Sequence, residues 1–252
     1  MSGPIKTSPT SRRVRVLFNH TYIVDTTSAL HVWEHEGYPQ FYIPFSELKN
    51  YKWSPLEFVP SEDGKSRATI MELTVQGPDK QEKSTDRAIF FSDGPAPKNL
   101  TGLVRLEFSA MDKWLEEDVP IYVHPKDPFK RIDILASTRS IEVKVSGHTV
   151  ASSPVSTHLL ETSLPTRYYL PLSAVDQAVL RPSDLITKCP YKGEAEYYNV
   201  VVGGETYKNL VWYYRLPTAE SAPIAGLVCF YNEKVDIYLD GKLLERPKTH
   251  FA

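Results

Sequence analysis

The segment Cys189-Pro-Tyr-Lys-Gly193 places a thiol and an amine three residues apart in a turn that carries both proline and glycine. A lysine withdrawn from water can form a Schiff base with a carbonyl group or can bind an anion. A thiol between Lys188 and Lys192 is a candidate nucleophile, because positive neighbours favour the thiolate. We predict that Lys192 and Cys189 are catalytic residues. The alternatives are a solvated Lys192 and an inert, buried Cys189.

Glu161 and Arg167 form a second charged group six residues apart. A carboxylate can act as a general base, and a guanidinium can bind the carboxylate or phosphate of a substrate through two parallel hydrogen bonds. We predict that Glu161 is catalytic and that Arg167 binds the substrate. The alternative is a mutual ion pair between these two side chains.

Large aromatic side chains surround these charged residues in the sequence. Apolar and aromatic walls with a few converging charges are typical of small-molecule sites. Aromatic residues in a sheet core give the same pattern and are the alternative interpretation. The predicted wall residues, all assigned to substrate binding, are Tyr169, Tyr198, Trp212 and Tyr231.

The histidines do not form a convincing metal site. His31 and His35 lie four residues apart in His-Val-Trp-Glu-His, a spacing that suits zinc on a helix. The segment is typical of a strand, however, where four residues span about 13 Å. His124 and His158 are isolated in the sequence. We expect neither a metal nor a cofactor.

The elements that must position these residues occur twice in the chain. Residues 13–46 align without a gap on residues 140–173, so that His31 matches His158 and Glu34 matches Glu161. Residues 101–104 then align on residues 225–228, after a net loss from the second copy. An internal repeat of this length indicates two homologous domains in tandem.

The second copy carries more of the reactive side chains than the first. The first copy has Gln40 in place of Arg167, Glu62 in place of Cys189 and Met71 in place of Tyr198. Its Lys65, Glu34 and Tyr42 are retained. We therefore expect one working site in the second copy and a weakened or altered site in the first.

Within each copy the hydrophobic residues alternate with a period of two, which predicts strands. Segments 14–26 and 141–153 are predicted hairpins that turn at Asn19-His20 and Ser146-Gly147. Short helical turns are expected near residues 46–49, 173–176 and 218–225. The predicted fold is mainly β: two tandem small β-rich domains, each a strongly bent sheet or partly open barrel, with few short helices.

We expect a disordered tail at 1–12, a first β-rich repeat at 13–125 and a proline-containing linker at 126–139. A second repeat follows at 140–245, and a short tail at 246–252 ends the chain.

The composition excludes several classes of protein. Of 252 residues, 41% are hydrophobic and 24% charged, with a net charge of −2, as in ordinary soluble domains. Apolar runs are too short to span a bilayer, and no secretory signal is evident. Two cysteines exclude a disulfide framework and suit a reducing compartment. We expect a cytoplasmic protein with neither nucleic-acid nor membrane partners.

The second copy resembles the domain of unknown function 427 family in the segments LLETSLPTRYYLP, KCPYKGEAEYY and IAGLVCFYNEKVDIY. The first copy is similar to the upstream half of members that carry the domain twice. The resemblance implies a compact, mainly β fold and no established reaction. Some catalogues label the family nucleotidyltransferase-like, but the sequence lacks a phosphate-binding glycine loop and a paired metal-binding carboxylate motif.

Two functions agree with these observations. The preferred prediction is a small-molecule enzyme, a metal-independent lyase, hydrolase or transferase, whose second domain acts on an anionic or carbonyl-containing metabolite. The alternative is a non-catalytic ligand-binding or protein-interaction module, in which the tandem arrangement provides bivalency. The expected partner is a small-molecule ligand, with the oligomeric state left open.

Overall fold

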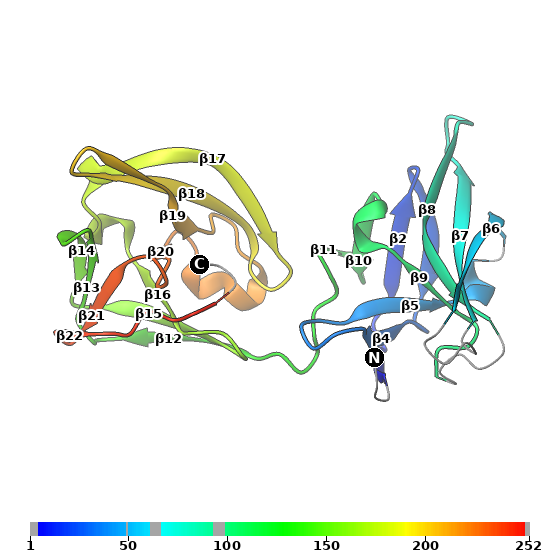
Figure 1. The fold of residues 1–252 in the computed structure, drawn as a ribbon, viewed down its shortest axis with the longest axis horizontal. Coiled ribbons are helices and arrows are strands. Elements are labelled where there is room, and N and C mark those ends of the chain that lie inside the picture. Colours follow the sequence, from blue (N-terminus) through cyan, green and yellow to red (C-terminus); the bar gives the residue numbers. More distant parts are fainter. Residues whose placement is uncertain (1–4, 49, 61–66, 93–98, 250–252) are drawn as a thin grey trace. The chain divides into compact units, whose positions relative to one another are not determined.

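The computed structural model describes residues 5–48, 50–60, 67–92 and 99–249 (Figure 1). The chain divides into two compact units, Met1–Asp127 and Pro128–Ala252, which we call the first and second domains. Both are mainly β, with short 3-10 helices, as predicted. No helix of the described residues is long and apolar enough to cross a membrane.

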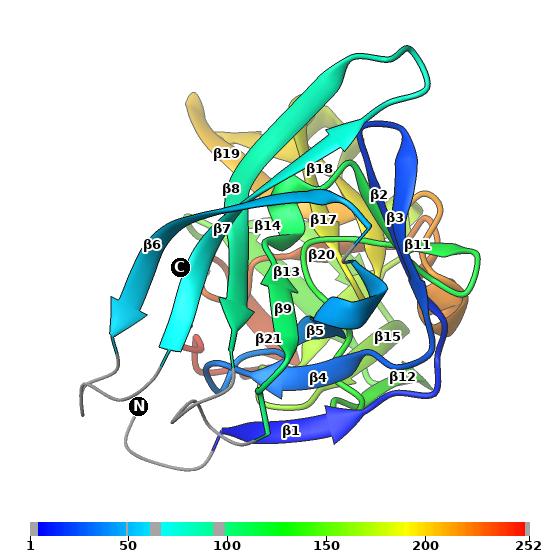
Figure 2. The ribbon, with the colours of Figure 1, turned by 90° about the vertical axis from the view of Figure 1, so that its right-hand side faces the viewer.

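The first domain contains two antiparallel sheets over its described residues. The seven-stranded sheet has the order β1-β4-β5-β9-β8-β7-β6 and the four-stranded sheet has the order β11-β10-β2-β3. Figure 2 shows the long strands β6, β7 and β8 curving across this domain. The strands are β1 (Lys6–Pro9), β2 (Val14–Phe18), β3 (Thr21–Thr26), β4 (Leu30–Trp33), β5 (Gln40–Pro44), β6 (Lys52–Pro60), β7 (Arg67–Gln76), β8 (Glu82–Phe91), β9 (Leu103–Leu106), β10 (Lys113–Glu116) and β11 (Val119–Ile121).

The second domain repeats this topology strand for strand. Its seven-stranded sheet has the order β12-β15-β16-β20-β19-β18-β17 and its four-stranded sheet has the order β14-β13-β21-β22. The strands are β12 (Ile132–Ser137), β13 (Ile141–Val145), β14 (His148–Ser153), β15 (Ser156–Glu161), β16 (Arg167–Leu170), β17 (Leu180–Cys189), β18 (Gly193–Val202), β19 (Glu205–Tyr213), β20 (Val228–Phe230), β21 (Asp236–Leu239) and β22 (Lys242–Leu243).

The matching strand orders agree with the internal repeat, and the sheets of the described residues do not close into a barrel. The short helices are η1 (Phe45–Glu47), η2 (Phe108–Ala110), η3 (Leu172–Ala174), η4 (Gln177–Val179) and η5 (Ala219–Ile224). Three of them, η1, η3 and η5, confirm the expected helical turns.

The two predicted hairpins form as expected. Asn19 and His20 have φ values of 49° and 58°, and Ser146 and Gly147 have 46° and 79°. Two successive residues with positive φ make a turn whose twist matches that of the flanking strands. These turns connect β2 to β3 and β13 to β14.

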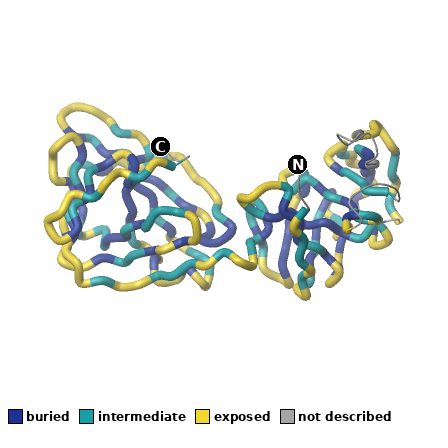
Figure 3. Tube along the Cα trace, turned by 60° about the horizontal axis from the view of Figure 1, so that its bottom comes forward, coloured by how far each residue is buried: buried dark blue, intermediate teal, exposed yellow. Residues whose placement is uncertain are grey.

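Each domain has one core between its two sheets and a smaller core on the other face of the seven-stranded sheet. In the second domain the inter-sheet core contains Val143, Leu170, Val200 and Phe230. The smaller core lies on the opposite face, where η5 contributes Ile224. Burial varies along the chain (Figure 3): β5 and β20 are almost wholly buried, whereas most of β17 is exposed.

Three expected boundaries differ from the structure. Lys6–Pro9 is strand β1, paired with β4 through the backbone, so this part of the expected disordered tail is ordered. Ile132–Ser137 is strand β12, paired with β15, so much of the expected linker belongs to the second sheet. Thr249 donates a hydrogen bond to Glu233, so the expected tail contacts its domain within the described residues. Backbone pairing does not require alternating hydrophobicity, so the sequence of β1 carries no pattern that indicates a strand.

Candidate functional site

A three-residue hairpin loop between β17 and β18 positions Cys189 and Lys192. Cys189 pairs with Gly193 at the end of this hairpin, and residues 190–192 form its turn. The loop is held by η5 and the residues before it, because the carbonyl of Tyr191 accepts hydrogen bonds from Thr218 and Ser221. The position of Lys192 is therefore fixed by contacts outside its own hairpin.

Gly193 has a φ of +99°, which lies outside the region that non-glycine residues tolerate. We expect Gly193→Ala to lower the free energy of unfolding by about 1–3 kcal/mol. Gly203→Ala is the control, because Gly203 has a φ of +61° and open space around it, and it should cost only about 1 kcal/mol. Urea unfolding measures both. Equal losses in the two variants would contradict a special role for Gly193.

Lys192, Glu161 and Cys189 lie close together, where the end of β15 meets the β17–β18 hairpin loop. The Nζ of Lys192 lies 2.5 Å from Oε2 of Glu161 and 3.8 Å from Sγ of Cys189. Lys192 and Glu161 are both only 8% exposed. This cluster, which we call the Lys192 cluster, therefore combines an amine, a carboxylate and a thiol with little access to water.

Arg167 does not pair with Glu161, in contrast to the alternative considered from the sequence. Its guanidinium donates to both carboxylate oxygens of Glu233, at 2.7 and 2.8 Å, and to Asn232 Oδ1 at 3.3 Å. Both members of the ion pair are buried. The guanidinium predicted to bind the substrate is thus paired with Glu233, a residue of the same domain that lies 66 positions further along the sequence.

Three of the predicted wall residues share the face of the sheet that carries these charges. Tyr169 lies opposite Cys229, and Cys229 lies opposite Trp212. Trp212 Nε1 donates to the hydroxyl of Tyr169 at 3.0 Å, and its ring lies 4.6 Å from that of Tyr231. The Arg167 guanidinium lies 5.5 Å from the Trp212 ring. These contacts join the wall to the Arg167–Glu233 pair.

Tyr198 is the one predicted wall residue that the structure places elsewhere. It lies opposite Val211 and packs against the inter-sheet core, where its ring stacks on Tyr213 at 5.0 Å. Its neighbour Tyr197 faces the site instead, opposite Trp212. Successive residues of a strand point to opposite faces, so a shift of one residue exchanges the two tyrosines.

The environment of this face favours uncharged tyrosines and an uncharged Cys229. Burial raises the pKa of Tyr169 and Tyr214 well above the usual value, and burial also raises the pKa of Cys229. Cys229 is therefore a core thiol. Burial alone would raise the pKa of Glu233, but hydrogen bonds from Arg167 and Thr249 outweigh burial and lower that pKa to about 2.

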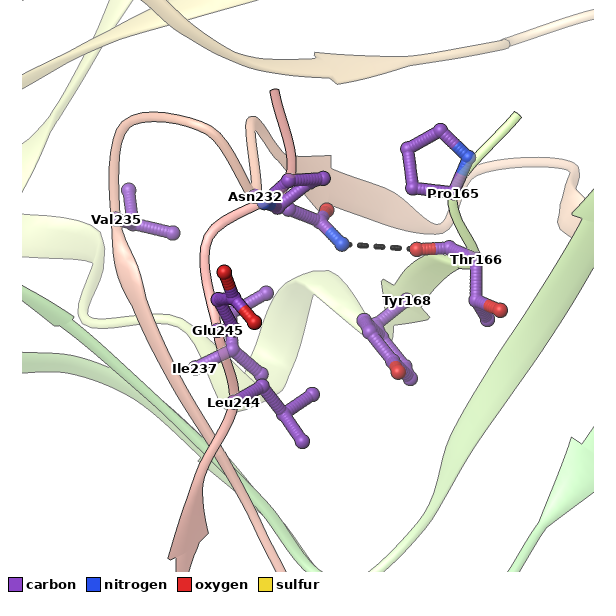
Figure 4. Close-up of a pocket in the computed structure, with 9 residues that line it drawn as sticks. Pro165, Thr166, Tyr168, Asn232, Val235, Ile237, Leu244 and Glu245 are labelled. Atoms are coloured by element: carbon purple, nitrogen blue, oxygen red, sulfur yellow. Dashed lines mark hydrogen bonds between the residues drawn. The ribbon is translucent and has the colours of Figure 1, made fainter. Parts of the chain in front are cut away.

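A small pocket of about 130 Å³, whose lining residues Figure 4 draws, includes Asn232, a hydrogen-bond partner of Arg167. Asn232 connects the pocket to the Arg167–Glu233 pair, since its Oδ1 accepts from Arg167 while its Nδ2 donates to the carbonyl of Thr166 at 2.8 Å. Tyr168 and Leu244 provide apolar surface. The full lining consists of Pro165, Thr166, Tyr168, Asn232, Val235, Ile237, Leu244, Glu245 and Pro247.

Sequence reasoning missed Asn232, Glu233 and Tyr197. The repeat contained a signal for Glu233: the first copy has Gln40 and Ser109 at the positions of Arg167 and Glu233, so both members of the pair differ together. Removing only one partner of a buried ion pair is strongly destabilising. Two positions that differ together between the copies therefore indicate that their side chains are paired.

The first domain has a different network at the equivalent place. Arg105, at the position of Cys229, pairs with Glu34 at 2.5 Å and with Glu107 at 2.9 Å. The hydroxyl of Tyr42 donates to Glu34 at 3.0 Å. Lys65 and Glu62, on which the sequence comparison also rested, lie outside the described residues. Glu34 is thus paired with an arginine of its own sheet.

Among the described residues, no group of three or more His, Cys, Asp or Glu side chains is placed to hold a metal ion. His31 is packed beside the rings of Trp33 and Phe41. His35 lies against Tyr38, which stacks on His124. These histidines make aromatic contacts in the first domain.

The two halves of the chain are copies of one domain, in which a seven-stranded and a four-stranded antiparallel sheet enclose a core. This defines a tandem, two-domain, mainly β protein. A family model described as "Domain of unknown function (DUF427)" matches residues 6–117 and 133–241, most of the chain. The chain therefore belongs to this family, as a member with two copies of the domain. A search of curated proteins found no match.

Proposed function

We propose that the second domain is a small-molecule enzyme that acts on an anionic or carbonyl-containing metabolite at the Lys192 cluster. One observation carries this proposal: Lys192 Nζ lies 2.5 Å from Glu161 Oε2 and 3.8 Å from Cys189 Sγ. An amine and a carboxylate within hydrogen-bond distance meet the geometric requirement for proton transfer between them. Burial strengthens this interaction relative to water.

The chemistry that this pair supports is imine formation. The ammonium of Lys192 gives a proton to Glu161, and the neutral amine attacks the carbonyl carbon of the substrate to form a carbinolamine. Glu161 returns the proton to the carbinolamine hydroxyl, which leaves as water. The products are a protonated imine, one water molecule and the Glu161 carboxylate, so atoms and charge balance. Cys189, whose Sγ lies 3.8 Å from Lys192 Nζ, can then add its thiol across the C=N bond of the imine, with sulfur bonding to carbon and the proton going to nitrogen.

Tyr169, Trp212 and Tyr231 support this site as its wall. Arg167 is occupied by Glu233, so we assign Arg167 the role of positioning Trp212 rather than of binding the substrate directly. We place the activity in the cytoplasm, because both cysteines are free thiols and a reducing compartment keeps thiols in this state.

Reductive trapping tests the proposal. The protein is incubated with pyruvate and borohydride, and mass spectrometry locates the adduct. We expect an adduct on Lys192 in the wild type, none at position 192 in Lys192→Arg, and trapping at least about 100-fold slower in Glu161→Gln. Lys144→Arg, which alters a lysine of the four-stranded sheet, should behave as wild type. Absence of an adduct at Lys192, or equal labelling of surface lysines, would overturn the proposal.

The pocket beside Asn232 favours a second candidate function, a non-catalytic ligand-binding module. Its volume of about 130 Å³ is smaller than the roughly 300–1,000 Å³ of typical ligand sites, so it fits a molecule of few atoms. A thermal-shift screen with nucleotides, sugar phosphates, keto acids, aldehydes and amino acids distinguishes the two candidates. A ligand of the pocket loses its stabilising effect in Tyr168→Ala but keeps it in Lys192→Ala. The reverse result supports the enzyme.

A further inference from the structure

We propose that Lys130 is a second cation of the Lys192 cluster and that the substrate carries an anionic group that Lys130 binds. This inference rests on the function proposed above and defines its substrate class: a small carbonyl compound with a carboxylate or another anion next to the carbonyl. Sequence reasoning assigned no role to Lys130 in the site.

Lys130 approaches the site from the segment that precedes β12. Its Nζ lies 3.7 Å from Oε1 of Glu161, whereas Lys192 is 2.5 Å from Oε2 of the same carboxylate. Each oxygen of Glu161 therefore faces one ammonium group. The Lys130 ammonium also lies 5.5 Å from the centre of the Tyr191 ring. Contacts with Glu161 and Tyr191 hold the Lys130 ammonium beside the β17–β18 hairpin loop that carries Lys192.

The two lysines differ in their access to solvent. The side chain of Lys130 is 19% exposed and that of Lys192 is 10% exposed. The weaker contact and the greater exposure make Lys130 the ammonium that an incoming anion meets first. Lys192 remains held by Glu161 until the carbonyl arrives.

Charge balance supports an anionic substrate. Lys130 and Lys192 both pair with Glu161, and no other carboxylate of the described residues forms an ion pair with either ammonium, so two cationic side chains share one carboxylate. The Arg167–Glu233 pair on the same face is already neutral. A partly buried charge without a counterion is costly, and a bound anion removes this cost.

The two copies differ in sequence at the position of Lys130. Strand pairing places Lys6 opposite Trp33 and Asp133 opposite Leu160, so β1 and β12 are equivalent and position 130 corresponds to Gly3. The first copy therefore has no lysine at this position of the sequence. This difference agrees with a working site in the second domain.

Trapping with a matched pair of carbonyl compounds tests the inference. Pyruvate carries a carboxylate next to its carbonyl, and methyl pyruvate is its neutral ester. We expect Lys130→Gln to slow trapping of pyruvate on Lys192 by about tenfold or more relative to trapping of methyl pyruvate, the size expected for losing a charge-assisted hydrogen bond. Lys130→Arg, which keeps the charge, should retain the preference for pyruvate.

Lys144→Gln is the matched control, because Lys144 also combines an ion pair, with Glu142 at 3.5 Å, and a ring contact, with Tyr238 at 4.8 Å. It should not change either rate. Cys189→Ser should keep the preference for pyruvate, which shows that the preference does not depend on the thiol. Melting temperatures confirm that each variant is folded.

The outcomes separate the two proposals. If neither compound is trapped at Lys192 in the wild type, the proposed function fails and this inference fails with it. If both are trapped but Lys130→Gln changes both rates equally, or neither, the enzyme proposal stands and the role of Lys130 is wrong. A loss of preference in Cys189→Ser would also contradict the charge count.

Discussion

Arg167→Met is expected to lower the free energy of unfolding of the second domain by about 3–5 kcal/mol, the cost typical of removing one partner of a buried ion pair. Arg167 and Glu233 are 7% and 9% exposed, and two hydrogen bonds join them. Without the guanidinium, the Glu233 carboxylate stays buried and keeps the hydrogen bond from Thr249. Urea unfolding followed by tryptophan fluorescence measures the loss, since Trp212 reports on the second domain and the other three tryptophans report on the first.

The matched control is Arg13→Met. Arg13 pairs with Asp25 through similar contacts, but their side chains are 40% and 44% exposed. An exposed pair contributes at most about 1 kcal/mol, so this variant should unfold almost as the wild type. The double variant Arg167→Met/Glu233→Leu should recover much of the lost stability, because it leaves no unpaired charge. Equal losses in Arg167→Met and Arg13→Met would contradict the argument.

The same pair makes an acid-dependent contribution. The pKa of Glu233 is lowered from 4.5 to about 2 in the folded protein. A carboxyl group with a lowered pKa in the folded state stabilises the fold at any pH above its pKa in the unfolded state. This contribution is lost as the pH falls from 4.5 towards 2. Glu233→Gln should therefore remove part of the pH dependence in this range.

The first domain is expected to lose stability at a higher pH, between about 6.5 and 4, because of His31. This side chain is 3% exposed, and neither ring nitrogen has a hydrogen-bond partner among the described residues. Burial and, secondly, the charge of Arg12 lower its pKa from 6.5 to about 4, against the opposing effect of Asp127. The unfolded chain therefore binds a proton in this range that the folded domain does not.

The lowered pKa of His31 does not change the free energy of unfolding above pH 6.5. The loss of stability is complete once the pH is below the pKa of the folded state. A shift of this size corresponds to a loss of up to about 3 kcal/mol. His31→Phe should flatten the dependence between pH 6.5 and 4, because phenylalanine cannot bind a proton. Unfolding is followed in a Trp212→Phe background, in which the remaining tryptophans belong to the first domain.

His158→Phe is the comparison for this prediction. His158 occupies the equivalent place in the second copy, but it is less buried and its Nε2 lies 3.0 Å from the hydroxyl of Ser156. Its pKa is lowered, mainly by burial. It should therefore have a smaller effect. A wild-type pH dependence that persists in His31→Phe would show that another group is responsible.

The sequence was a good guide wherever the information is local. The alternation of apolar residues predicts the strands, and the pairs Asn19-His20 and Ser146-Gly147 predict their hairpin turns. The repeat predicts that the two domains share one topology, which their strand orders confirm. The turn from Cys189 to Gly193 is equally local, so the closeness of Cys189 and Lys192 follows from the loop length.

The faces of the strands could not be assigned from the sequence. In the second domain both faces of the seven-stranded sheet are buried over part of their length, one by the inter-sheet core and one around Tyr169 and Ile224. When both faces are apolar, alternation does not show which residue points where. The choice between Tyr197 and Tyr198 as the wall residue is therefore made by the tertiary structure.

The amino-acid sequence by itself determined the mainly β class, the duplication, the hairpins and the cluster of reactive residues in the second copy. Only the tertiary structure decided the partners of the charges: Arg167 with Glu233, and Glu161 with Lys192 and Lys130. The physical reason is sequence separation. These contacts join strands that become neighbours through sheet pairing and the covering of one face by η5, whereas hydrophobic period and turn type report only on residues a few positions apart.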